Sequence, residues 1–321
     1  MPSQLVKLAL IDPAAYIASG VESDLDVEKF SIYQDGALDA SRQVISIEAD
    51  TAVIENDREL ITSKVYTLDV VGLYSQSKRA KLQGWSKNAT PLYITGYGLD
   101  GSFLYAYGTI TVIEGFDSNT SFKFRFQSAS VGGYDPVTTT HSSGLIYSTN
   151  GTSYYKWQAR PGNPNSLPYW YNGFNILGVE PLGSLDTGEE LEAGSPAYSF
   201  ADDGFRIQCD GTSRVWGYQS LFFPFDNVEL KFTTYVSSYT QTGAVPARIG
   251  VYSYTDNFDA NAENSQNANV TGTGDFTASI TTLPGTNVVK VRHGVLEDTD
   301  IVFKRPRLNI GSVKPFTEFN T

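Results

Sequence analysis

Histidine and cysteine, which often supply nucleophilic and metal-binding groups, are scarce in this sequence. There are two histidines, His141 and His293, and one cysteine, Cys209. A Ser–His pair needs an orienting acid, and no Gly-x-Ser-x-Gly elbow surrounds either histidine. Two separated histidines and one cysteine are too few ligands for a zinc site. We therefore predict no catalytic residue and no metal site, and we interpret Cys209 as a small buried hydrophobic residue.

The other motifs for chemistry are equally weak. No Walker-type loop and no strand-coupled GxGxxG turn is present, so we predict no cofactor. Two distant acids can converge for glycoside hydrolysis, but 35 acidic residues make chance pairs common. The acid-rich segments 189–192 and 202–203 offer oxygen atoms to Ca²⁺ without EF-hand spacing. We interpret both segments as solvated acidic loops.

Aromatic residues of the C-terminal half are the best candidates for ligand binding. Exposed rings can stack on the faces of sugars, and the candidate glycan contacts are Trp216, Tyr218, Tyr252 and Tyr254, with Tyr235 and Tyr239 as further members. The alternative is that these rings fill a sandwich core or form cross-strand pairs. A surface cluster with polar neighbours would indicate glycan binding, whereas burial would indicate a scaffold.

Composition excludes several classes of function. The formal net charge is −12, and phosphate neutralisation needs clustered Lys and Arg, so we predict no specific nucleic-acid binding. No segment approaches about 20 consecutive apolar residues, so we predict no membrane insertion. Charged residues make up only 18% while aromatic residues reach 13% and glycines number 29. That balance favours short strands over long helices.

In the N-terminal half, alternation and capping signals define the expected elements. Residues 75–88 are typical of a short helix with Ser75 as its N-cap and Ala80, Leu82 and Trp85 in one apolar stripe. Residues 99–102 carry a hairpin signal. Strands are expected at 64–74 (apolar on both faces, hence central in a sheet), 91–95, 103–113 and 121–127 (three phenylalanines on one face).

The remaining chain divides into a connection and a second strand-rich region. Residues 135–174 are rich in turn residues and interleaved aromatics, which predicts an ordered linker between domains 1–134 and 175–321. The Asn-rich stretch 256–269 is predicted to be an exposed loop. Strands are expected at 205–209, 228–236, 248–254, 275–280, 287–292 and 301–304, which together indicate an antiparallel sandwich.

The last part of the sequence resembles a known kind of module. Residues 300–316 read DIVFKRPRLNIGSVKPF, which is similar to the "strand, Pro-x-Leu, x-x-Gly-Ser, x-x-Pro-Phe/Trp" ending of jelly-roll, carbohydrate-binding-like modules of phage tail and fibre proteins. Segments 201–207 and 218–235 contribute to the likeness. Asn309 stands where many of these modules have Glu. The resemblance implies an antiparallel jelly-roll β-sandwich that serves adhesion or decoration.

The N-terminal half resembles, more loosely, the ring domains of phage tail-tube and distal-tail proteins. The likeness covers residues 60–130, through a strand ending at Tyr74, a helix reaching Trp85 and the segments 91–94 and 103–108. The family implies a β-sandwich or barrel-like ring domain that closes a homohexamer around a channel. It also implies a location in the tail of the virion, after synthesis in the host cytoplasm, and contacts with other tail proteins.

Three functions from different classes follow. The first is a ring-forming virion structural protein, a tail-tube or distal-tail subunit whose jelly roll serves decoration or adhesion to a host-surface glycan. The second is a carbohydrate-binding attachment protein, either a fibre or a receptor-binding protein. The third, a polysaccharide-degrading enzyme, is disfavoured because the sequence offers no recognisable catalytic set. We therefore expect a protein that is not an enzyme.

Overall fold

The computed structural model describes a mainly β protein. Its described residues are 5–12, 26–31, 44–56, 59–71, 75–98, 101, 103–114, 121–128, 145–147, 153–156, 186–193, 197–201, 204–255 and 262–313, and in several strands only the backbone is described. They fall into two compact units, one containing β1–β7 with α2 and the other β8–β19. The predicted fold class, mainly β with one short helix, is confirmed. No helix in the described ranges is long and apolar enough to span a membrane.

The first unit is built on one antiparallel sheet in the order β2-β1-β5-β6-β7-β4-β3. Its strands are β1 (Leu5–Asp12), β2 (Asp26–Ser31), β3 (Val44–Asn56), β4 (Glu59–Val71), β5 (Leu92–Gly98), β6 (Phe103–Glu114) and β7 (Ser121–Ser128). β4 lies inside the sheet, between β3 and β7, as its two apolar faces predict. The β5–β6 hairpin turns at Gly101, whose φ of 82° suits glycine.

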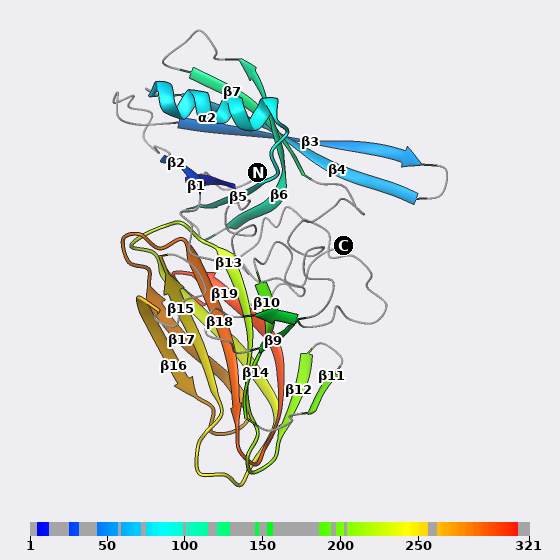
Figure 1. The fold of residues 1–321 in the computed structure, drawn as a ribbon, viewed down its shortest axis with the longest axis vertical. Coiled ribbons are helices and arrows are strands. Elements are labelled where there is room, and N and C mark those ends of the chain that lie inside the picture. Colours follow the sequence, from blue (N-terminus) through cyan, green and yellow to red (C-terminus); the bar gives the residue numbers. More distant parts are fainter. Residues whose placement is uncertain are drawn as a thin grey trace. The chain divides into compact units, whose positions relative to one another are not determined.

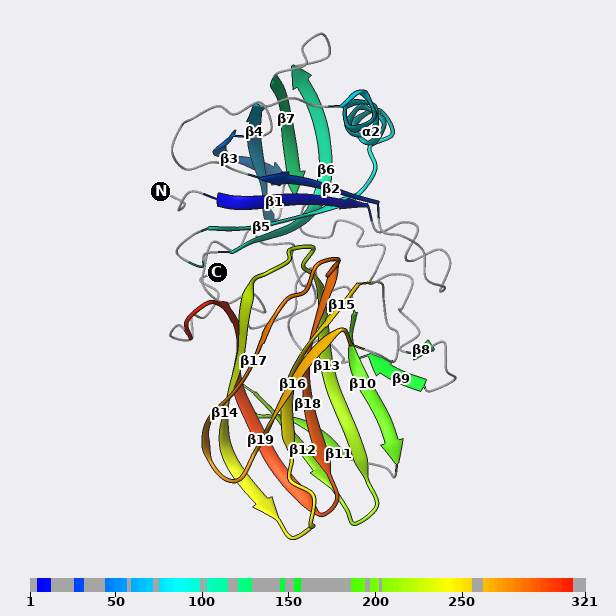
Figure 2. The same cartoon turned by 90° about the vertical axis from the view of Figure 1, so that its left-hand side faces the viewer.

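This sheet curls on itself. The rings of Phe30 in β2 and Phe124 in β7 lie 6.4 Å apart, centroid to centroid, although three strands separate β2 from β7 in the sheet order. Figure 2 shows β1 and β5 crossing β7 at a steep angle. Phe124 and Phe126 are fully buried while Arg125 and Gln127 are exposed. The predicted alternation in β7 is therefore confirmed over residues 124–127, and Phe124 and Phe126 fill the inside of the curl.

Helix α2 (Gln76–Lys87) begins where the sequence predicts. The hydroxyl of Ser75 accepts a hydrogen bond from a first-turn N–H at 3.2 Å, which satisfies one donor at the helix N-terminus. Leu82 and Trp85 are buried, as predicted. Ala80 is exposed, so its place in the apolar stripe was wrong. Two residues span about 200° around a helix, which puts Ala80 on the side opposite Leu82.

Contacts with two strands hold α2 in place. Nζ of Lys78 lies 2.6 Å from a carboxylate oxygen of Glu28 and 4.8 Å from the ring centroid of Phe30, both in β2. On β6, the N–H of Val112 donates to the hydroxyl of Ser86 at 3.0 Å. The helix thus joins strands that are far apart in the sheet order.

A two-stranded hairpin extends beyond the sheet of the first unit (Figure 1). β3 and β4 pair along their whole length, from Val44 with Val71 to Asn56 with Glu59. β4 pairs with β7 only over 65–71. The outer part, 51–56 with 59–64, is therefore a ribbon with no further strand beside it among the described residues. We call it the projecting hairpin.

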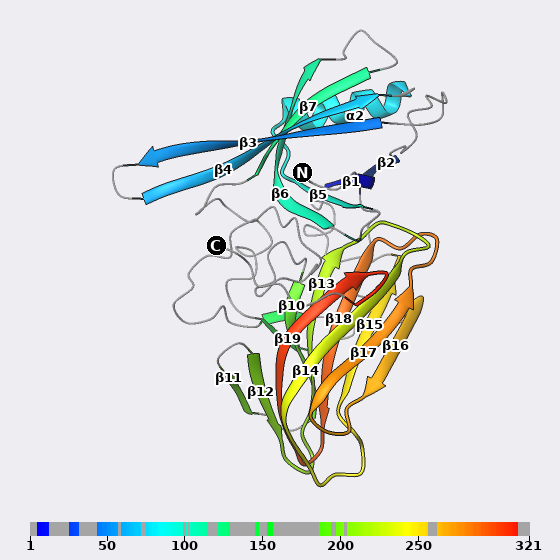
Figure 3. The ribbon, with the colours of Figure 1, turned by 180° about the vertical axis from the view of Figure 1, so that it is seen from behind.

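The second unit is a sandwich of two antiparallel sheets, as predicted. The larger sheet has the order β16-β15-β18-β13-β10-β9-β8 and the smaller one the order β11-β12-β19-β14-β17. Figure 3 shows β19, β14 and β17 side by side in the smaller sheet. The strands are β8 (Leu145–Tyr147), β9 (Ser153–Lys156), β10 (Asp186–Ala193), β11 (Ala197–Ala201), β12 (Gly204–Cys209), β13 (Arg214–Phe222), β14 (Glu229–Gln241), β15 (Arg248–Tyr254), β16 (Asn264–Asn269), β17 (Gly274–Thr281), β18 (Val288–Leu296) and β19 (Thr299–Ile310).

The sandwich core contains one histidine and the cysteine, the residue types considered above as possible nucleophiles and metal ligands. His293 directly follows the strand expected at 287–292, but it lies within β18 and points into the core, where its ring centroid is 5.1 Å from that of Phe232 and 4.6 Å from that of Phe303. The expected end of the strand was wrong because β18 stays paired with β13 as far as Leu296. Cys209 is buried, as predicted, and burial raises the pKa of its thiol to about 12.

The Asn-rich stretch is only partly a loop. Residues 264–269 form the edge strand β16, which corrects the prediction of an exposed loop, while 256–261 lie outside the described residues. The side chain of Gln266 accepts from the N–H of Ser279 in β17 at 2.6 Å, and Asn264 donates to the carbonyl of Thr281 at 2.8 Å. Side-chain hydrogen bonds therefore join β16, at the edge of the larger sheet, to β17, at the edge of the smaller sheet. These contacts favour a strand at 264–269 although its residues are polar.

Two other sequence expectations fall in this unit. Residues 189–192, predicted as a solvated acidic loop, lie in β10, which pairs with β9 and β13. Residues 202–203 lie outside the described residues. Most of the predicted linker 135–174 does as well, but β8 and β9 within it belong to the larger sheet. The predicted domain boundaries at 134 and 175 stay a prediction.

The last strand, β19, is longer than predicted and contains Pro306. Thr233 pairs with Arg307, but Tyr235 pairs with Lys304, so β19 carries one extra residue at this point. Arg305 has a φ of 50°, in the left-handed region. This bulge lets the strand pass through a proline, which has no N–H to donate to the ladder.

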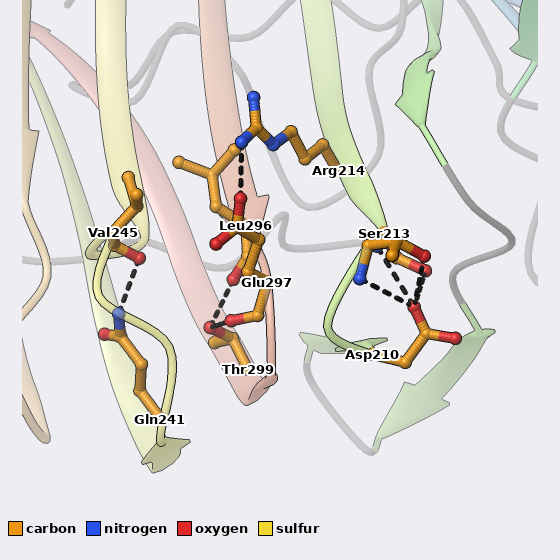
Figure 4. A network of polar contacts seen from close by, with 9 residues as sticks. Asp210, Ser213, Arg214, Gln241, Val245, Leu296, Glu297 and Thr299 are labelled. Atoms are coloured by element: carbon orange, nitrogen blue, oxygen red, sulfur yellow. Dashed lines mark hydrogen bonds and ion pairs between the residues drawn. The ribbon is translucent and has the colours of Figure 1, made fainter.

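Turns at one end of the sandwich are joined by polar contacts (Figure 4). One carboxylate oxygen of Asp210 accepts from the hydroxyl of Ser213 at 2.6 Å, and this hydrogen bond holds the pKa of Asp210 below its usual value. The N–H of Asp298 donates to the carbonyl of Asp210 at 3.1 Å. Arg214 forms an ion pair with Glu297. The β12–β13 and β18–β19 turns therefore support each other.

Candidate binding face on the larger sheet

The register of the larger sheet defines which side chains share its outer face. His293 of β18 points into the core, so its neighbours Arg292 and Gly294 lie on the opposite face. Gly294 pairs with Trp216 in β13 and with Arg248 in β15. We call this surface the outer face, and its described members include Trp216, Arg248, Gly250, Tyr252, Tyr254, Ser265, Asn267, Asn269, Val288, Lys290, Arg292 and Gly294.

Trp216 forms a flat platform on this face. A Cβ added at Gly294 would lie 2.5 Å from Cε3 and 2.6 Å from Cη2 of Trp216, so the indole lies directly over the glycine backbone. Trp216 is half-buried, so part of it remains open to solvent. A glycine at position 294 is thus required for the ring to lie flat across β18. A partly exposed indole of this kind can stack on the apolar face of a sugar ring.

Tyr252 lies over a second glycine, but its ring is enclosed. A Cβ added at Gly250 would lie 2.6 Å from Cε2 of Tyr252. The hydroxyl donates to the side-chain oxygen of Asn267 at 2.5 Å, and the guanidinium carbon of Arg292 lies 4.9 Å from the ring centroid. Only 9% of Tyr252 is exposed, and burial raises the pKa of its hydroxyl. Tyr252 therefore positions Arg292 and Asn267 rather than offering its own ring.

The other aromatic candidates take different places. Tyr254 is 4% exposed, and Nζ of Lys290 lies 5.4 Å from its ring centroid. Tyr218 is the register partner of Arg292, and its side chain is outside the described part of the chain. Tyr235 and Tyr239 belong to β14 in the smaller sheet. The sequence candidates thus do not form one exposed cluster.

The structure separates the two interpretations of these aromatics. Glycan contact remains a prediction for Trp216, which is the half-exposed ring. For Tyr252 and Tyr254, burial favours the alternative of cross-strand packing. Sequence reasoning missed Arg248, Arg292 and the two glycines, because their place beside Trp216 depends on strand register. The sequence signal that could have placed Arg292 on the outer face is the alternation in β18 of Val289, Val291 and His293 with Lys290 and Arg292.

The described residues contain no group of three or more His, Cys, Asp or Glu side chains placed to hold a metal ion. His293 is enclosed in the core, and burial lowers its pKa to about 3. His141 lies outside the described residues. The outer face instead presents the flat ring of Trp216 together with amide and guanidinium groups, which suit ligand binding.

Comparisons with known proteins give weak likenesses. No protein-family model matches the sequence, and no curated protein is similar to it. The solved structures with some likeness include the enzymatically active domain of tailspike protein 4 of bacteriophage CBA120, at 8% identity and a TM-score of 0.30 over 38% of this chain and 19% of that chain. A CBM61 module in complex with β-1,4-galactotriose gives 11% identity and a TM-score of 0.27, over 37% of this chain and 86% of that one.

A third structure covers more of the chain. The SPP1 Dit protein, described as a hub of the adsorption apparatus of phages infecting Gram-positive bacteria, gives 10% identity over 84% of this chain and 90% of that chain, with a TM-score of 0.16. The chain matches less than two thirds of the length of the tailspike structure. Such low TM-scores assign neither a fold nor a function to this chain.

Proposed function

We propose that this chain is a structural, non-enzymatic protein of a phage tail, which forms a ring through its first unit and binds a host-surface glycan through its second. The observation that carries the adhesive part is the half-exposed indole of Trp216 lying flat over Gly294 on the outer face. The ring-forming part continues the resemblance of residues 60–130 to tail-tube and distal-tail ring domains.

The projecting hairpin supports assembly. A two-stranded ribbon is only marginally stable by itself in water. Among the described strands β2 and β3 are the two edges of their sheet, and such edges invite further pairing. A neighbouring copy could cover the ribbon and an edge at the same time. Closed cyclic symmetry would satisfy every copy equally, and a homohexamer is the expected state. Other tail proteins would contact the two sides of the ring.

The outer face supports binding without turnover. Trp216 supplies an apolar stacking surface, and Asn267, held by the Tyr252 hydroxyl, supplies an amide for sugar hydroxyls. One shallow site of this kind binds weakly, and several copies on one ring compensate through avidity. A separate attachment protein of the fibre type would use the same face, and it differs from the proposal in lacking the ring.

The glycan part is tested with the full chain displayed multivalently on beads against an array of bacterial surface polysaccharides. Binding should be lost in Trp216→Ala. It should persist in Tyr235→Ala, which removes an aromatic residue that is 38% exposed on the other sheet. Equal loss in both variants, or no binding by the unaltered chain, would leave decoration of the tail as the better account. Release of reducing ends would overturn the non-enzymatic assignment.

The ring part is tested by native mass spectrometry of the full chain at high concentration and by its copy number in virions. A hexamer in either measurement supports the proposal. A monomer in both measurements contradicts it and favours the fibre-type attachment protein. A polymer of stacked rings would favour the tail tube over the distal tail.

A further inference from the structure

The outer face gathers positive charge in a chain that is acidic overall. Arg248 and Arg292, both half-buried, and the buried Lys290 lie on the adjacent strands β15 and β18, whereas the formal net charge of the chain is −12. On the neighbouring strand β16 the face continues with the amides of Asn267 and Asn269. On β10, strand pairing places Glu190 opposite Trp216 and Asp186 opposite Ser220 on the same face, so the acidic residues of this face lie on the side away from β15.

Two of these cations lie close together. Arg248 pairs with Gly294, two positions from Arg292 in β18, so the Cα atoms of the two arginines are diagonal neighbours about 7–8 Å apart. Both guanidinium groups act on the same phenol: their charges favour ionisation of Tyr252 against the larger effect of burial, which raises its pKa. Like charges at this spacing repel, and an anion between them would relieve the repulsion.

Arg248 is half-buried. Its Nε is enclosed and has no hydrogen-bond partner in the described part of the protein, so a ligand would meet the terminal nitrogen atoms of the guanidinium group. A guanidinium group presents a planar fork of donors that matches the oxygen atoms of a carboxylate or a phosphate. Arg248 lies on β15, next to the glycine that carries the Trp216 platform. An oxyanion donor set and a stacking surface therefore meet at Gly294.

We infer, building on the glycan-binding function proposed above, that the ligand of the outer face is an acidic polysaccharide whose carboxylate or phosphate binds Arg248 and Arg292 while a sugar ring stacks on Trp216. Glu190 is the register partner of Trp216 on β10, three strands from Arg248 in the sheet order, so the anion would bind on the β15 side of the indole.

The negative net charge of the chain argues against non-specific binding of an acidic polysaccharide. An acidic protein repels a polyanion over long distances, although salt limits the range to about 8 Å at physiological ionic strength. If a polyanion binds this chain, non-specific electrostatic attraction would therefore not be the cause. Such binding requires a local site where the field is reversed, and the outer face has the residues for one.

The test measures binding of the immobilised full chain to four soluble polymers by interferometry. Polygalacturonate carries carboxylates, its methyl-esterified form has the same backbone without charge, poly(glycerol phosphate) carries phosphates, and dextran is neutral. We expect one of the two charged polymers to bind at least about tenfold more tightly than methyl-esterified polygalacturonate and dextran. The polymer that binds identifies the anion as a carboxylate or a phosphate.

Variants then locate the site. Arg248→Gln or Arg292→Gln should weaken binding of the charged polymer by about tenfold or more. Arg248→Lys keeps the charge but loses the fork, so binding should be intermediate. Arg125→Gln is the matched control, because it removes one positive charge from an exposed position of β7 in the first unit. Melting temperatures establish that each variant is folded.

Three results would overturn the inference in distinguishable ways. Equal binding of polygalacturonate and its methyl ester, lost in Trp216→Ala, would disprove anion recognition and leave the glycan-binding function standing. No binding to any of the polymers or to arrayed bacterial polysaccharides would overturn both. Binding of a charged polymer that survives both arginine substitutions would place the site elsewhere.

Discussion

His293 and Phe303 pack ring against ring across the sandwich, with their centroids 4.6 Å apart, although they belong to different sheets. The surrounding core lowers the pKa of His293 to about 3, because burial disfavours the charged imidazolium. The imidazole therefore serves as a flat core side chain at neutral pH. A histidine that must stay neutral makes the stability of this unit depend on pH.

We expect acid to destabilise the second unit through His293. The unfolded chain binds a proton at His293 below its ordinary pKa of about 6.5, whereas the folded chain does so only near the lowered value of about 3. The free energy of unfolding should therefore fall as the pH drops from 6.5 toward 3, by at most about 1.4 kcal/mol per pH unit. Urea unfolding of the wild type and His293→Leu at pH 7 and pH 4 measures this. The variant should lose less stability over this window, and identical losses would refute the assignment.

Gly294 should be required for the position of Trp216. A methyl group at residue 294 would overlap the indole, so Gly294→Ala should cost about 1–3 kcal/mol through overpacking. It should also shift the tryptophan fluorescence as the ring is displaced. The double variant Gly294→Ala/Trp216→Ala should cost clearly less than the sum of the single variants, as expected for residues in contact. Additive costs in urea unfolding would show that the two residues do not touch.

Gly311 tests backbone strain without a packing change. Its φ is 70°, and nothing lies within 4 Å of an added Cβ. Gly311→Ala should therefore cost about 1 kcal/mol from the left-handed backbone alone. Gly272 also has open space around its Cβ, and its φ is outside the left-handed region, so Gly272→Ala should be neutral or slightly stabilising. Equal effects of the two substitutions on the melting temperature would contradict the assigned conformation.

The seam between β16 and β17 should depend on Gln266. Its side chain accepts from the N–H of Ser279 at 2.6 Å, and Gln266→Ala leaves that N–H to water. The variant should lose about 0.5–1.5 kcal/mol, and the Ser279 amide should exchange hydrogen faster. Asn269→Ala, on the same strand and also exposed, is the control. Unchanged exchange at Ser279 in Gln266→Ala would show that the seam is held by other contacts.

Local periodicity and capping determined much of the fold. The polar, β-branched and aromatic composition predicts strands, and β15 was expected with its observed bounds at residues 248 and 254. The helix that begins after Ser75 is predicted by the capping hydroxyl of Ser75 and by the helical spacing of Leu82 and Trp85. Alternation alone predicts that Phe124 and Phe126 of β7 point inward. All these features depend on residues within a few positions of each other in the chain.

Contacts between distant segments decided the rest. Residues 264–269 are a strand because β15 and β17 supply partners on both sides, and their polar composition does not reveal that. His293 lies in the core because β18 stays in register with β13 past residue 293. Trp216 meets Gly294, and Arg248 meets the same glycine, through pairings of residues far apart in sequence. A slip of one residue in any of these registers would move every side chain of the strand to the other face. Which strands are neighbours, and which residues pair between them, is decided only when the sheet folds.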